Sequence, residues 1–216
     1  MPQCVRYLHD PGSGLELILC RRSRICYPLH SHVSVFAAGL VLGGRLRLTV
    51  EGSGRVLQKG EWFLIPPDTP HSLAPEGCYS LLSLCLPAGP LRRQTCGDAK
   101  ASDPIAALKR RLEQHPEEPL RLEEMAAAAY TSKYHLIRVF QRRAGLTPHQ
   151  FQLQNRVRKA QRLLAGLESG GRAAPVTVAE AAQAAGFCDQ SHLTRQFERV
   201  VGLSPAAYRA ACGRLP

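Results

Sequence analysis

The sequence lacks the long apolar segments that a membrane-spanning or exported protein needs. None of its apolar runs approaches the roughly 18–20 residues of a membrane-spanning helix. The first residues, MPQCVRYLHDPGSG, contain no apolar stretch typical of a secretory signal. We therefore expect a cytoplasmic location. With 44% hydrophobic and 21% charged residues, the 216-residue chain has the composition of a folded globular protein, which excludes an intrinsically disordered chain.

The sequence also lacks a CxxC pair, although it contains 8 cysteines. Their spacing is not that of a zinc finger, and a chain without a secretory signal is expected in a reducing compartment. Most of these cysteines are therefore expected to be buried thiols. Cys20 and Cys26 are the pair of most interest, because they lie just upstream of two histidines.

Acidic residues are few relative to basic ones. The chain has 28 Lys and Arg against 17 Asp and Glu, a formal net charge of +11. Such an excess indicates a polyanionic partner, either nucleic acid or a membrane surface. The excess is larger in the second half, with 17 basic against 10 acidic residues in 103–216, compared with 11 against 7 in 1–102. No long basic run is present, so folded helices have to carry this charge.

The pattern of the sequence changes near residue 90. Before it, short apolar stretches alternate with Gly and Pro turns, and in 45–50 the alternation of apolar and polar residues is that of a half-buried strand. Several such strands predict a β-sandwich or barrel. Residues 88–102 are small and polar, as in a linker, and Asp103-Pro104 then has the form of a helix N-cap. The predicted strands are 15–20, 45–51, 61–67 and 79–87.

The second half contains an internal repeat, which appears when the sequence is shifted by 57 residues. Matching apolar, Gly and Pro positions indicate that the same supersecondary unit is built twice. The matched pairs are Glu123 and Glu180, Tyr130 and Phe187, Leu136 and Leu193, Arg138 and Arg195, Phe140 and Phe197, Arg142 and Arg199, Gly145 and Gly202, Leu146 and Leu203, Pro148 and Pro205, and Phe151 and Tyr208.

Each unit has the sequence of two helices joined by a short turn. In the second helix of the first unit, Leu136, Val139 and Phe140 form a buried stripe, and Gly145 ends the helix. This pattern is typical of a helix-turn-helix. A longer helix, from Thr147-Pro148 to about Leu164, connects the units and is roughly 25 Å long. That length suits two units facing successive major grooves, about 34 Å apart. In the second unit the corresponding residues are Asp189 as N-cap, Leu193, Phe197 and Gly202.

On these residues, the second half resembles the AraC/XylS family of bacterial transcription regulators. The more specific unit is AEAAQAAGFCDQSHLTRQFERVVGLSPAAYR, with GF-x-x-QS-x-L-x-R-x-F followed by G-x-SP-x-x-YR. The first unit, TSKYHLIRVFQRRAGLTPHQF, fits as well. The stretch 166–177 is several residues longer than is usual in the family. The alternative interpretation of this half is a helical protein–protein or solenoid unit, which the charge on the exposed helix faces disfavours.

The resemblance implies that the second helix of each unit contacts DNA. Arg can pair with guanine and Gln with adenine in the major groove, whereas the later Arg142, Arg143 and Arg199 suit phosphate contacts. We expect His135 and His192, on the same helices, to contact phosphate, solvent or neighbouring side chains. The predicted DNA-binding residues are Lys133, Tyr134, Ile137, Arg138, Gln141, Arg142, Gln190, Ser191, Thr194, Arg195 and Arg199.

The first half resembles the cupin-like effector domain of the same family, and cupins more broadly. The residues that carry this resemblance are His30-x-His32 and the later Gly60, Pro66, Asp68 and His71. Two histidines at i and i+2 project from one face of a strand, and a third could meet them. Three imidazoles suit Zn, Ni, Cu or Fe. Enzymatic cupins carry a glutamate four or five residues after the second histidine, where this sequence has Phe36 and Ala37; Cys20, Cys26 and Cys85 are candidate replacements.

Together these features predict an α+β multidomain protein. A cupin-like β-barrel, residues 1–88, is followed by a linker, 89–102, and an all-α DNA-binding domain, 103–216. Within that domain we expect two helix-turn-helix units joined by a linker helix. Their predicted bounds are about 120–145 for the first unit, 148–165 for the linker helix and 177–202 for the second unit.

The predicted function is transcription regulation, with double-stranded DNA as partner and a small effector sensed by the N-terminal domain. His30, His32 and His71 are the predicted effector site, for a transition metal or a small organic molecule, although they could also be structural. In a metal site, occupancy should fall as the pH drops through about 6–6.5. The resemblance adds RNA polymerase and a second copy of the chain as partners.

No catalytic nucleophile and no phosphate-binding loop is apparent, so we do not expect an enzyme. The alternatives are a constitutive DNA binder with a dimerising N-terminal domain, or a metal-dependent cupin isomerase or dioxygenase. The remaining histidines, His9, His115 and His149, are predicted to lie at the surface.

Overall fold

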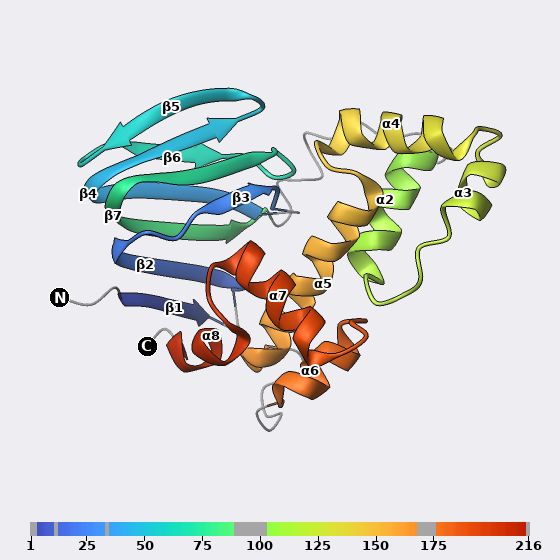
Figure 1. Cartoon of the computed structure of the whole chain (residues 1–216). Helices are drawn as coiled ribbons and strands as arrows, with labels where there is room; N and C mark the ends of the chain where they lie inside the picture. The colour runs from blue at the N-terminus through green and yellow to red at the C-terminus, as the bar shows by residue number, and fades with distance from the viewer. Residues whose placement is uncertain (1–3, 11–12, 33–34, 89–102, 168–175, 215–216) are drawn as a thin grey trace.

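The computed structural model of the chain describes residues 4–10, 13–32, 35–88, 103–167 and 176–214. Figure 1 shows a β-sheet domain from the N-terminal half beside a helical domain from the C-terminal half, with helix α5 (Pro148–Leu164) along their boundary. The predicted linker, 89–102, and most of the stretch 166–177 lie outside the described residues, so the domain boundaries placed there stay predictions. Among the helices that the structure describes, none is long and apolar enough to span a bilayer.

The N-terminal domain is built on an eight-stranded sheet with the hydrogen-bonded order β5-β4-β7-β2-β1-β8, in which β3 pairs with β7 and β6 with β4. Seven of the strands come from the N-terminal half, and β8 comes from the C-terminal end of the described chain. The alternation predicted in 45–50 is present, because Leu46 and Leu48 are buried while Arg45 and Arg47 are exposed. The strands are β1 (Cys4–Asp10), β2 (Leu15–Ser23), β3 (Tyr27–His30), β4 (Val35–Val50), β5 (Ser53–Gln58), β6 (Trp62–Ile65), β7 (His71–Pro87) and β8 (Cys212–Arg214).

The long strands β4 and β7 pair along most of their lengths, and their register shifts on both sides of Gly43–Gly44. Such irregularities bend a strand and increase its twist. Gly44 adopts φ +71, and a Cβ there would lie 1.9 Å from the carbonyl oxygen of Cys78. Only glycine meets both demands, and the bend lets Leu46, Leu57 and Ile65 pack in one core.

The helices of the C-terminal domain begin at the N-cap residues that the sequence predicts. Asp103 caps α2 (Pro104–Gln114), and Ser132 caps α4 (Lys133–Ala144), the second helix of the first unit and its predicted recognition helix; each side chain accepts a backbone N–H. Asp189 does the same for the second recognition helix, α7. The predicted fold class, a β domain followed by an all-α domain with two helix-turn-helix units, is confirmed. The helices are α2 (Pro104–Gln114), α3 (Leu122–Ala128), α4 (Lys133–Ala144), α5, α6 (Val178–Ala184), α7 (Gln190–Val201) and α8 (Pro205–Ala211).

The residues of the two units do not correspond through one constant difference in residue number. The hydrogen bond from the amide of Thr131 to the carbonyl of Ala126 corresponds to that from Phe187 to Ala182, which is a shift of 56. The N-caps of α4 and α7 differ by 57, because the second turn contains one more residue. The predicted pairing of Tyr130 with Phe187 is therefore wrong, as is that of Glu123 with Glu180. Tyr130 is 100% exposed with φ +50, whereas Phe187 is 5% exposed in the core.

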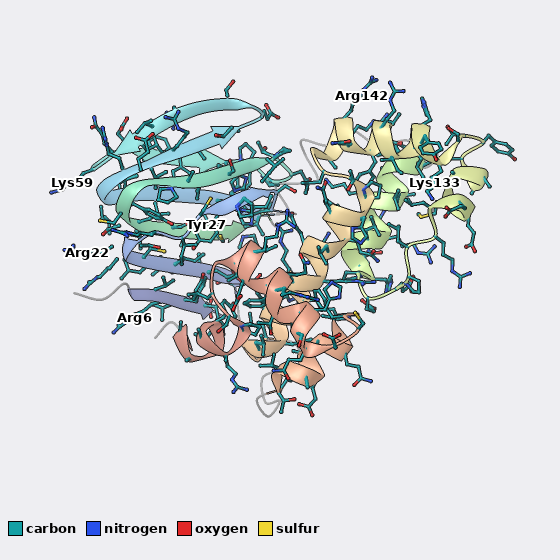
Figure 2. The ribbon with its side chains drawn as sticks, viewed as in Figure 1. Arg6, Arg22, Tyr27, Lys59, Lys133 and Arg142 are labelled. Carbon is teal, nitrogen blue, oxygen red and sulfur yellow. The ribbon has the colours of Figure 1, made fainter. Side chains whose placement is uncertain are left out.

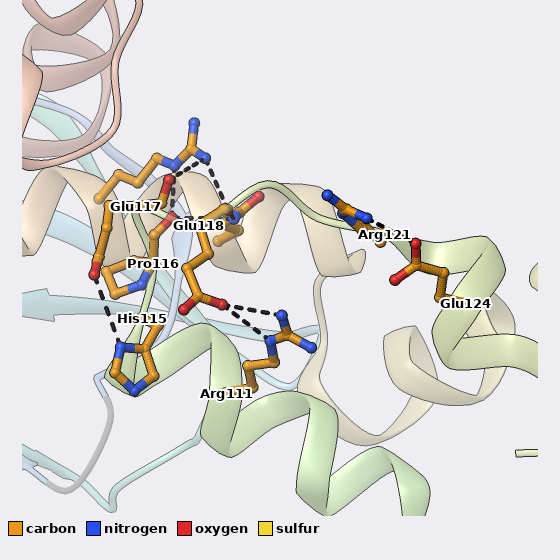
Figure 3. Close-up of polar contacts among 9 residues, drawn as sticks. Arg111, His115, Pro116, Glu117, Glu118, Arg121 and Glu124 are labelled. Carbon is orange, nitrogen blue, oxygen red and sulfur yellow. Dashed lines mark hydrogen bonds and ion pairs between the residues drawn. The ribbon is translucent and has the colours of Figure 1, made fainter. Parts of the chain in front are cut away.

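The loop between α2 and α3 is fastened to α5 by polar contacts. The guanidinium of Arg156 donates to the carbonyls of Pro116, Glu117 and Glu118, with Nε 2.7 Å from the oxygen of Pro116. Figure 3 shows the loop, with Arg111 paired to the carboxylate of Glu118. The same loop packs against the turn of the second unit, because a Cβ on Gly186 would lie 2.6 Å from the Cα of Glu117. The loop therefore couples both units to α5.

The two domains share a hydrophobic core and a strand pair. Tyr7 of β1 is 7% exposed and belongs to the core of the second unit, where its ring centroid lies 4.8 Å from that of Tyr208. Strand β8 pairs in parallel with β1, with Tyr7 opposite Cys212. The sequence indicated neither strand, and it placed His9 at the surface. That prediction is wrong, because His9 lies in β1 and is 6% exposed.

The glycines that end the two recognition helices also touch the N-terminal domain. Gly145 and Gly202 both adopt the left-handed conformation, with φ +72 and +79. A Cβ on Gly145 would lie 2.1 Å from Cγ of Pro70, and one on Gly202 would lie 2.1 Å from Cγ2 of Ile25. Glycine therefore serves both the helix end and the domain contact at each position.

The difference between the two turns can be tested by truncating the aromatic side chains that a constant shift would pair. Phe187→Ala should lower the free energy of unfolding by about 3–5 kcal/mol, because it empties a core position. Tyr130→Ala should change it by no more than about 0.5 kcal/mol, because the ring is exposed. Urea unfolding of both variants measures this, and similar losses would contradict the assignment of the turns.

Candidate functional site

The recognition helices α4 and α7 lie toward opposite ends of α5 (Figure 1). Each buries one stripe and presents the opposite face. In α4 the buried side chains are Leu136, Phe140 and Ala144, and in α7 they are Leu193, Phe197 and Val201. Most of the predicted DNA-binding residues are exposed, and Ile137 and Thr194 are partly buried. The structure thus places these residues on outward faces, while their contacts with DNA stay predictions.

The polar side chains on these faces differ in how free they are to contact a partner, because some are already bonded within the chain. Figure 2 shows Arg142 projecting outward from α4. Lys133 forms an ion pair with Glu123, and Arg143 is paired with Asp103, so these two side chains are held by their own domain. The hydroxyl of Thr194 donates to the carbonyl of Gln190 at 2.8 Å.

The three predicted effector-site histidines lie together. One candidate ligand atom from each of His30, His32 and His71 lies within 4.8 Å of the others. His30 and His71 are directly opposite in the β3–β7 pair. The ring centroids are 4.2 Å apart for His30 and His71 and 5.0 Å apart for each of the other two pairs.

The hydrogen bonds of two of these rings fix their protonation. Nδ1 of His30 lies 2.7 Å from the carbonyl oxygen of Pro28, and Nδ1 of His71 lies 2.9 Å from that of Thr69. A carbonyl can only accept, so Nδ1 carries the proton in each ring and Nε2 keeps its lone pair. This arrangement is typical of metal-binding histidines, whose other nitrogen donates to a carbonyl or carboxylate.

Burial keeps the three rings neutral. It lowers the pKa of His30 to about 3, with a further contribution from His71, and lowers the pKa of His32 well below its usual value. The pKa of His71 is lowered for the same reason. Neutral imidazoles are the form that binds a metal ion. The lowered pKa values therefore move the predicted loss of metal from pH 6–6.5 to lower pH.

The other predicted ligands do not join this group. Cys20 is buried in the N-terminal core, Cys26 is exposed, and burial raises the pKa of the Cys85 thiol to about 12. The carboxylate of Asp68 lies 2.8 Å from Nζ of Lys109 on α2, so it links the two domains. Among the described residues, the group is formed by the three histidines alone. The set fits a three-imidazole metal site without a protein carboxylate.

A cavity of about 600 Å³ lies beside this group, between the sheet and α5. Its size is within the range of small-molecule sites. The N-terminal domain contributes Glu16, Tyr27, His30 and His32, and α5 contributes Gln154 and Arg158. Nη2 of Arg158 lies 3.5 Å from Nδ1 of His32, and the amide of Gln154 donates to the carbonyl of Leu29 at 3.0 Å.

Sequence reasoning missed the contribution of α5 to the cavity. It treated this helix as a spacer between two DNA-binding units. Gln154, Arg158 and Arg162 recur every four residues and so lie on one face of the helix. That spacing was visible in the sequence, but nothing there indicated that this face meets the histidines.

Comparisons with known proteins match each domain to a family. Residues 125–211 match the model of a helix-turn-helix domain, and residues 27–79 match that of a cupin domain. The chain combines an AraC-type helix-turn-helix domain with a cupin domain. The chain is also similar in fold to ToxT from Vibrio cholerae, with a TM-score of 0.63 and 10% sequence identity. The matched region covers 91% of this chain and 98% of ToxT. That likeness shows the fold alone.

Curated relatives match parts of this chain. It is 31% identical over 98 residues to "Probable transcriptional regulator LumQ" of Photobacterium leiognathi, covering 45% of this chain and 37% of that protein. It is 33% identical over 99 residues to "HTH-type transcriptional regulator MtrA" of Neisseria gonorrhoeae, covering 46% of this chain and 31% of that protein. It is 37% identical over 62 residues to "Quercetin 2,3-dioxygenase" of Bacillus subtilis, covering 28% of this chain and 18% of that protein. The chain spans about a third of the length of the two regulators.

The buried histidines should make the stability of the chain depend on pH. Histidines of the unfolded chain titrate near 6.5, whereas the folded chain resists protonation, with a pKa of about 3 for His30. Stability is therefore complete above about pH 6.5 and falls as the pH drops from there toward 3, by up to about 1.4 kcal/mol per pH unit for each histidine.

Urea unfolding between pH 7 and 5, with a chelator present, measures this dependence. The His30→Gln variant should show a shallower fall than the natural chain, because one buried imidazole is removed. His149→Gln, which replaces an exposed histidine, is the matched control and should leave the fall unchanged. An identical fall in all three chains would contradict a role for the buried imidazole.

Proposed function

We propose that this chain is a DNA-binding transcription regulator whose cupin domain senses a small effector. The observation that carries the proposal is the pair of helix-turn-helix units with outward polar faces, joined by one helix that also contacts the cupin domain. The names of two relatives, LumQ and MtrA, support regulation of transcription. Access to the chromosome requires a cytoplasmic location, which the proposal includes.

The proposed DNA interface is the exposed face of α4 and α7. Arg138, Gln141, Gln190 and Arg195 are proposed to contact bases, because Arg and Gln can each form two hydrogen bonds with a purine edge. Arg142 and Arg199 are placed in the last turns of their helices, where phosphate contact is favoured. The other proposed DNA-contacting residues are Lys133, Tyr134, Ile137, Ser191 and Thr194.

The proposed effector site is the histidine group with the adjoining cavity. A transition metal, Zn, Ni, Cu or Fe, is one occupant that the three imidazoles fit, and a metal there would supply a positive centre able to take an oxygen ligand. The constitutive DNA binder remains the alternative if the site is structural. RNA polymerase and a second copy of the chain are further proposed partners.

A metal-dependent cupin enzyme is the second candidate function. The three-histidine group and the similarity to a quercetin dioxygenase favour it. We place it second because no carboxylate joins the imidazoles among the described residues and because two helix-turn-helix units would have no role in such an enzyme. Turnover of quercetin by the metal-loaded chain would reverse this order.

The two roles proposed for arginine in α7 predict different effects of truncation. Arg195→Ala should weaken specific binding by about 1–3 kcal/mol and relax the preference at one or two base pairs. Arg199→Ala should instead weaken binding to all sequences alike and lower the salt dependence by about one unit of log affinity per log unit of salt.

Binding to a library of randomised duplexes, measured at several salt concentrations, separates these effects. The natural chain should lose affinity steeply as salt rises, because its net positive charge displaces counterions from DNA. A base preference that is unchanged at every position in Arg195→Ala would rule out base contact by this side chain.

Metal analysis of the purified chain tests the metal form of the effector site. The natural chain should carry a stoichiometric transition metal, and the His30→Ala, His71→Ala double variant should not. His149→Ala serves as the control, since that ring is exposed. DNA binding with and without a chelator then shows whether the metal is an effector. Equal metal content in the natural chain and the double variant would refute the metal form.

A further inference from the structure

A row of exposed basic side chains follows the bend of the β-sheet. Gly43, at the bend of β4, pairs with Ser80 of β7. The amide of Arg22, in β2, donates to the hydroxyl of Ser80 at 3.1 Å, so the end of β2 reaches the same bend. Arg45 follows the bend in β4 and pairs with Gln58 of β5. We call this row the basic margin, and its members, all exposed, are Arg6, Arg21, Arg22, Arg45 and Lys59.

The basic margin crosses the sheet from β1 to β5. Arg6 lies diagonally opposite Arg21, because Cys4 pairs with Arg21 in the antiparallel β1–β2 pair. Lys59 directly follows the end of β5. The order β1-β2-β7-β4-β5 contains four strand-to-strand steps, so the row is roughly 19 Å long. All of its members except Lys59 are arginines, whose planar forks suit phosphate oxygens.

The charges of the basic margin are not compensated within the part of the chain that the structure describes. None of its five side chains forms an ion pair there. By contrast, the neighbouring Arg47 is paired with Glu76 at 2.8 Å. The acidic residue next to Lys59 in the turn is Glu61, whose carboxylate accepts the amide of Gln58 at 2.7 Å. The basic margin therefore presents its positive charge to a partner.

The basic margin and the first recognition helix lie on opposite sides of the molecule. Figure 2 shows Arg6, Arg22 and Lys59 along one side and Lys133 and Arg142 of α4 on the other. Salt screens charges from each other beyond about 8 Å under physiological conditions. The basic margin therefore does not act on a duplex that α4 holds across the molecule, and it needs a partner of its own.

The form of the basic margin suits a linear polyanion. Duplex DNA carries about one charge per 1.7 Å of its axis, so a row of roughly 19 Å faces several phosphates. Protein surfaces that bind membranes combine cations with apolar side chains that enter the lipid. The residues at the bend between these cations are instead small or polar, namely Gly43, Gly44, Gln58 and Ser80. The pattern favours DNA over a lipid surface.

We propose that the basic margin binds the phosphate backbone of a second duplex while α4 and α7 hold the first, so that one chain joins two segments of DNA. The contacts are with phosphates, so the second duplex is held without regard to its sequence. The inference goes beyond the proposed regulation of transcription and shares with it only the first duplex. It also gives a role to positive charge that the recognition helices do not use.

A two-duplex retention experiment tests this proposal. A duplex that the full chain selects from a randomised library is fixed to beads, and a fluorescent duplex of unrelated sequence is supplied in solution. The natural chain should retain the fluorescent duplex at low salt. The Arg22→Gln, Arg45→Gln double variant should retain about tenfold less, with a salt dependence lower by nearly two log units per log unit of salt, because two phosphate contacts are lost.

The matched control is the Arg47→Gln, Arg55→Gln double variant. It removes the same charge from the same domain, but Arg47 is paired with Glu76, and Arg55 donates to the carbonyl of Trp62 at 3.3 Å. This variant should retain as much fluorescent duplex as the natural chain. Both double variants should hold the bead-bound duplex as tightly as the natural chain, because neither changes a recognition helix.

Equal retention by the two double variants would overturn the proposal, because a bridge that does not need the basic margin comes from another surface, such as that of a second copy. Phosphatidylcholine vesicles with and without phosphatidylserine test the lipid alternative. The reporter is the only tryptophan, Trp62, three residues after Lys59. A shift of its emission with the anionic vesicles, together with no retention of the second duplex, would assign the basic margin to a membrane and refute the proposal.

Failure of the proposed function has a different result in the same experiment. The natural chain would then not bind the bead-bound duplex. Titration of the two double variants with the fluorescent duplex alone would still decide the role of the basic margin, because weaker binding by Arg22→Gln, Arg45→Gln than by Arg47→Gln, Arg55→Gln supports it and equal binding contradicts it.

Discussion

The position of α5 beside the histidine segment of the cupin domain is the constraint on which the rest of the structure depends. It brings Gln154 onto the backbone of Leu29 and Arg158 beside His32. The same helix packs through Phe151 in the core of the first DNA-binding unit and through Val157 and Ala160 in that of the second. A single rigid element therefore touches the histidine group and both recognition units.

The contacts that hold the domains together are of two kinds. At β1, Tyr7 enters the core of the second unit, and burying an aromatic side chain contributes several kcal/mol. At α2 and α5 the contacts are polar, with the Lys109–Asp68 ion pair from α2 and the hydrogen bond of Gln154 from α5. Polar interfaces between domains of one chain are typical of arrangements that can rearrange. A ligand that binds one arrangement better than another shifts their populations by its difference in affinity.

Interactions between residues close in the sequence were enough to predict much of the helical domain. N-caps such as Asp189 and helix-ending glycines such as Gly202 act within one turn, so the sequence shows them directly. The convergence of His30, His32 and His71 was predicted from an i, i+2 pair on one strand face and a third histidine from a later strand. The three do converge, but β3 ends at His30, so His32 follows the strand and does not lie in it.

What the sequence could not show depends on contacts between distant segments. The pairing of β1 with β8 joins the two ends of the described chain, and no local pattern marks it. His9 was assigned to the surface because its burial comes from that packing. The turn of the second unit contains one additional residue, so Tyr130 does not correspond to Phe187. Comparing the two units at one constant difference in residue number cannot account for such an insertion. The place of Arg158 in the cavity wall depends on the packing of α5 beside His32, which no local pattern shows.

The central claim is that α5 couples the cupin domain to the DNA-binding helices. Hydrogen–deuterium exchange of the full chain, alone and bound to a duplex selected by it, tests this directly. The account predicts that DNA changes the exchange of residues 27–32 and 154–162 along with that of the recognition helices, because all of them contact α5 or belong to it. Changes confined to 133–144 and 190–201, with the cupin domain unaltered, would contradict it.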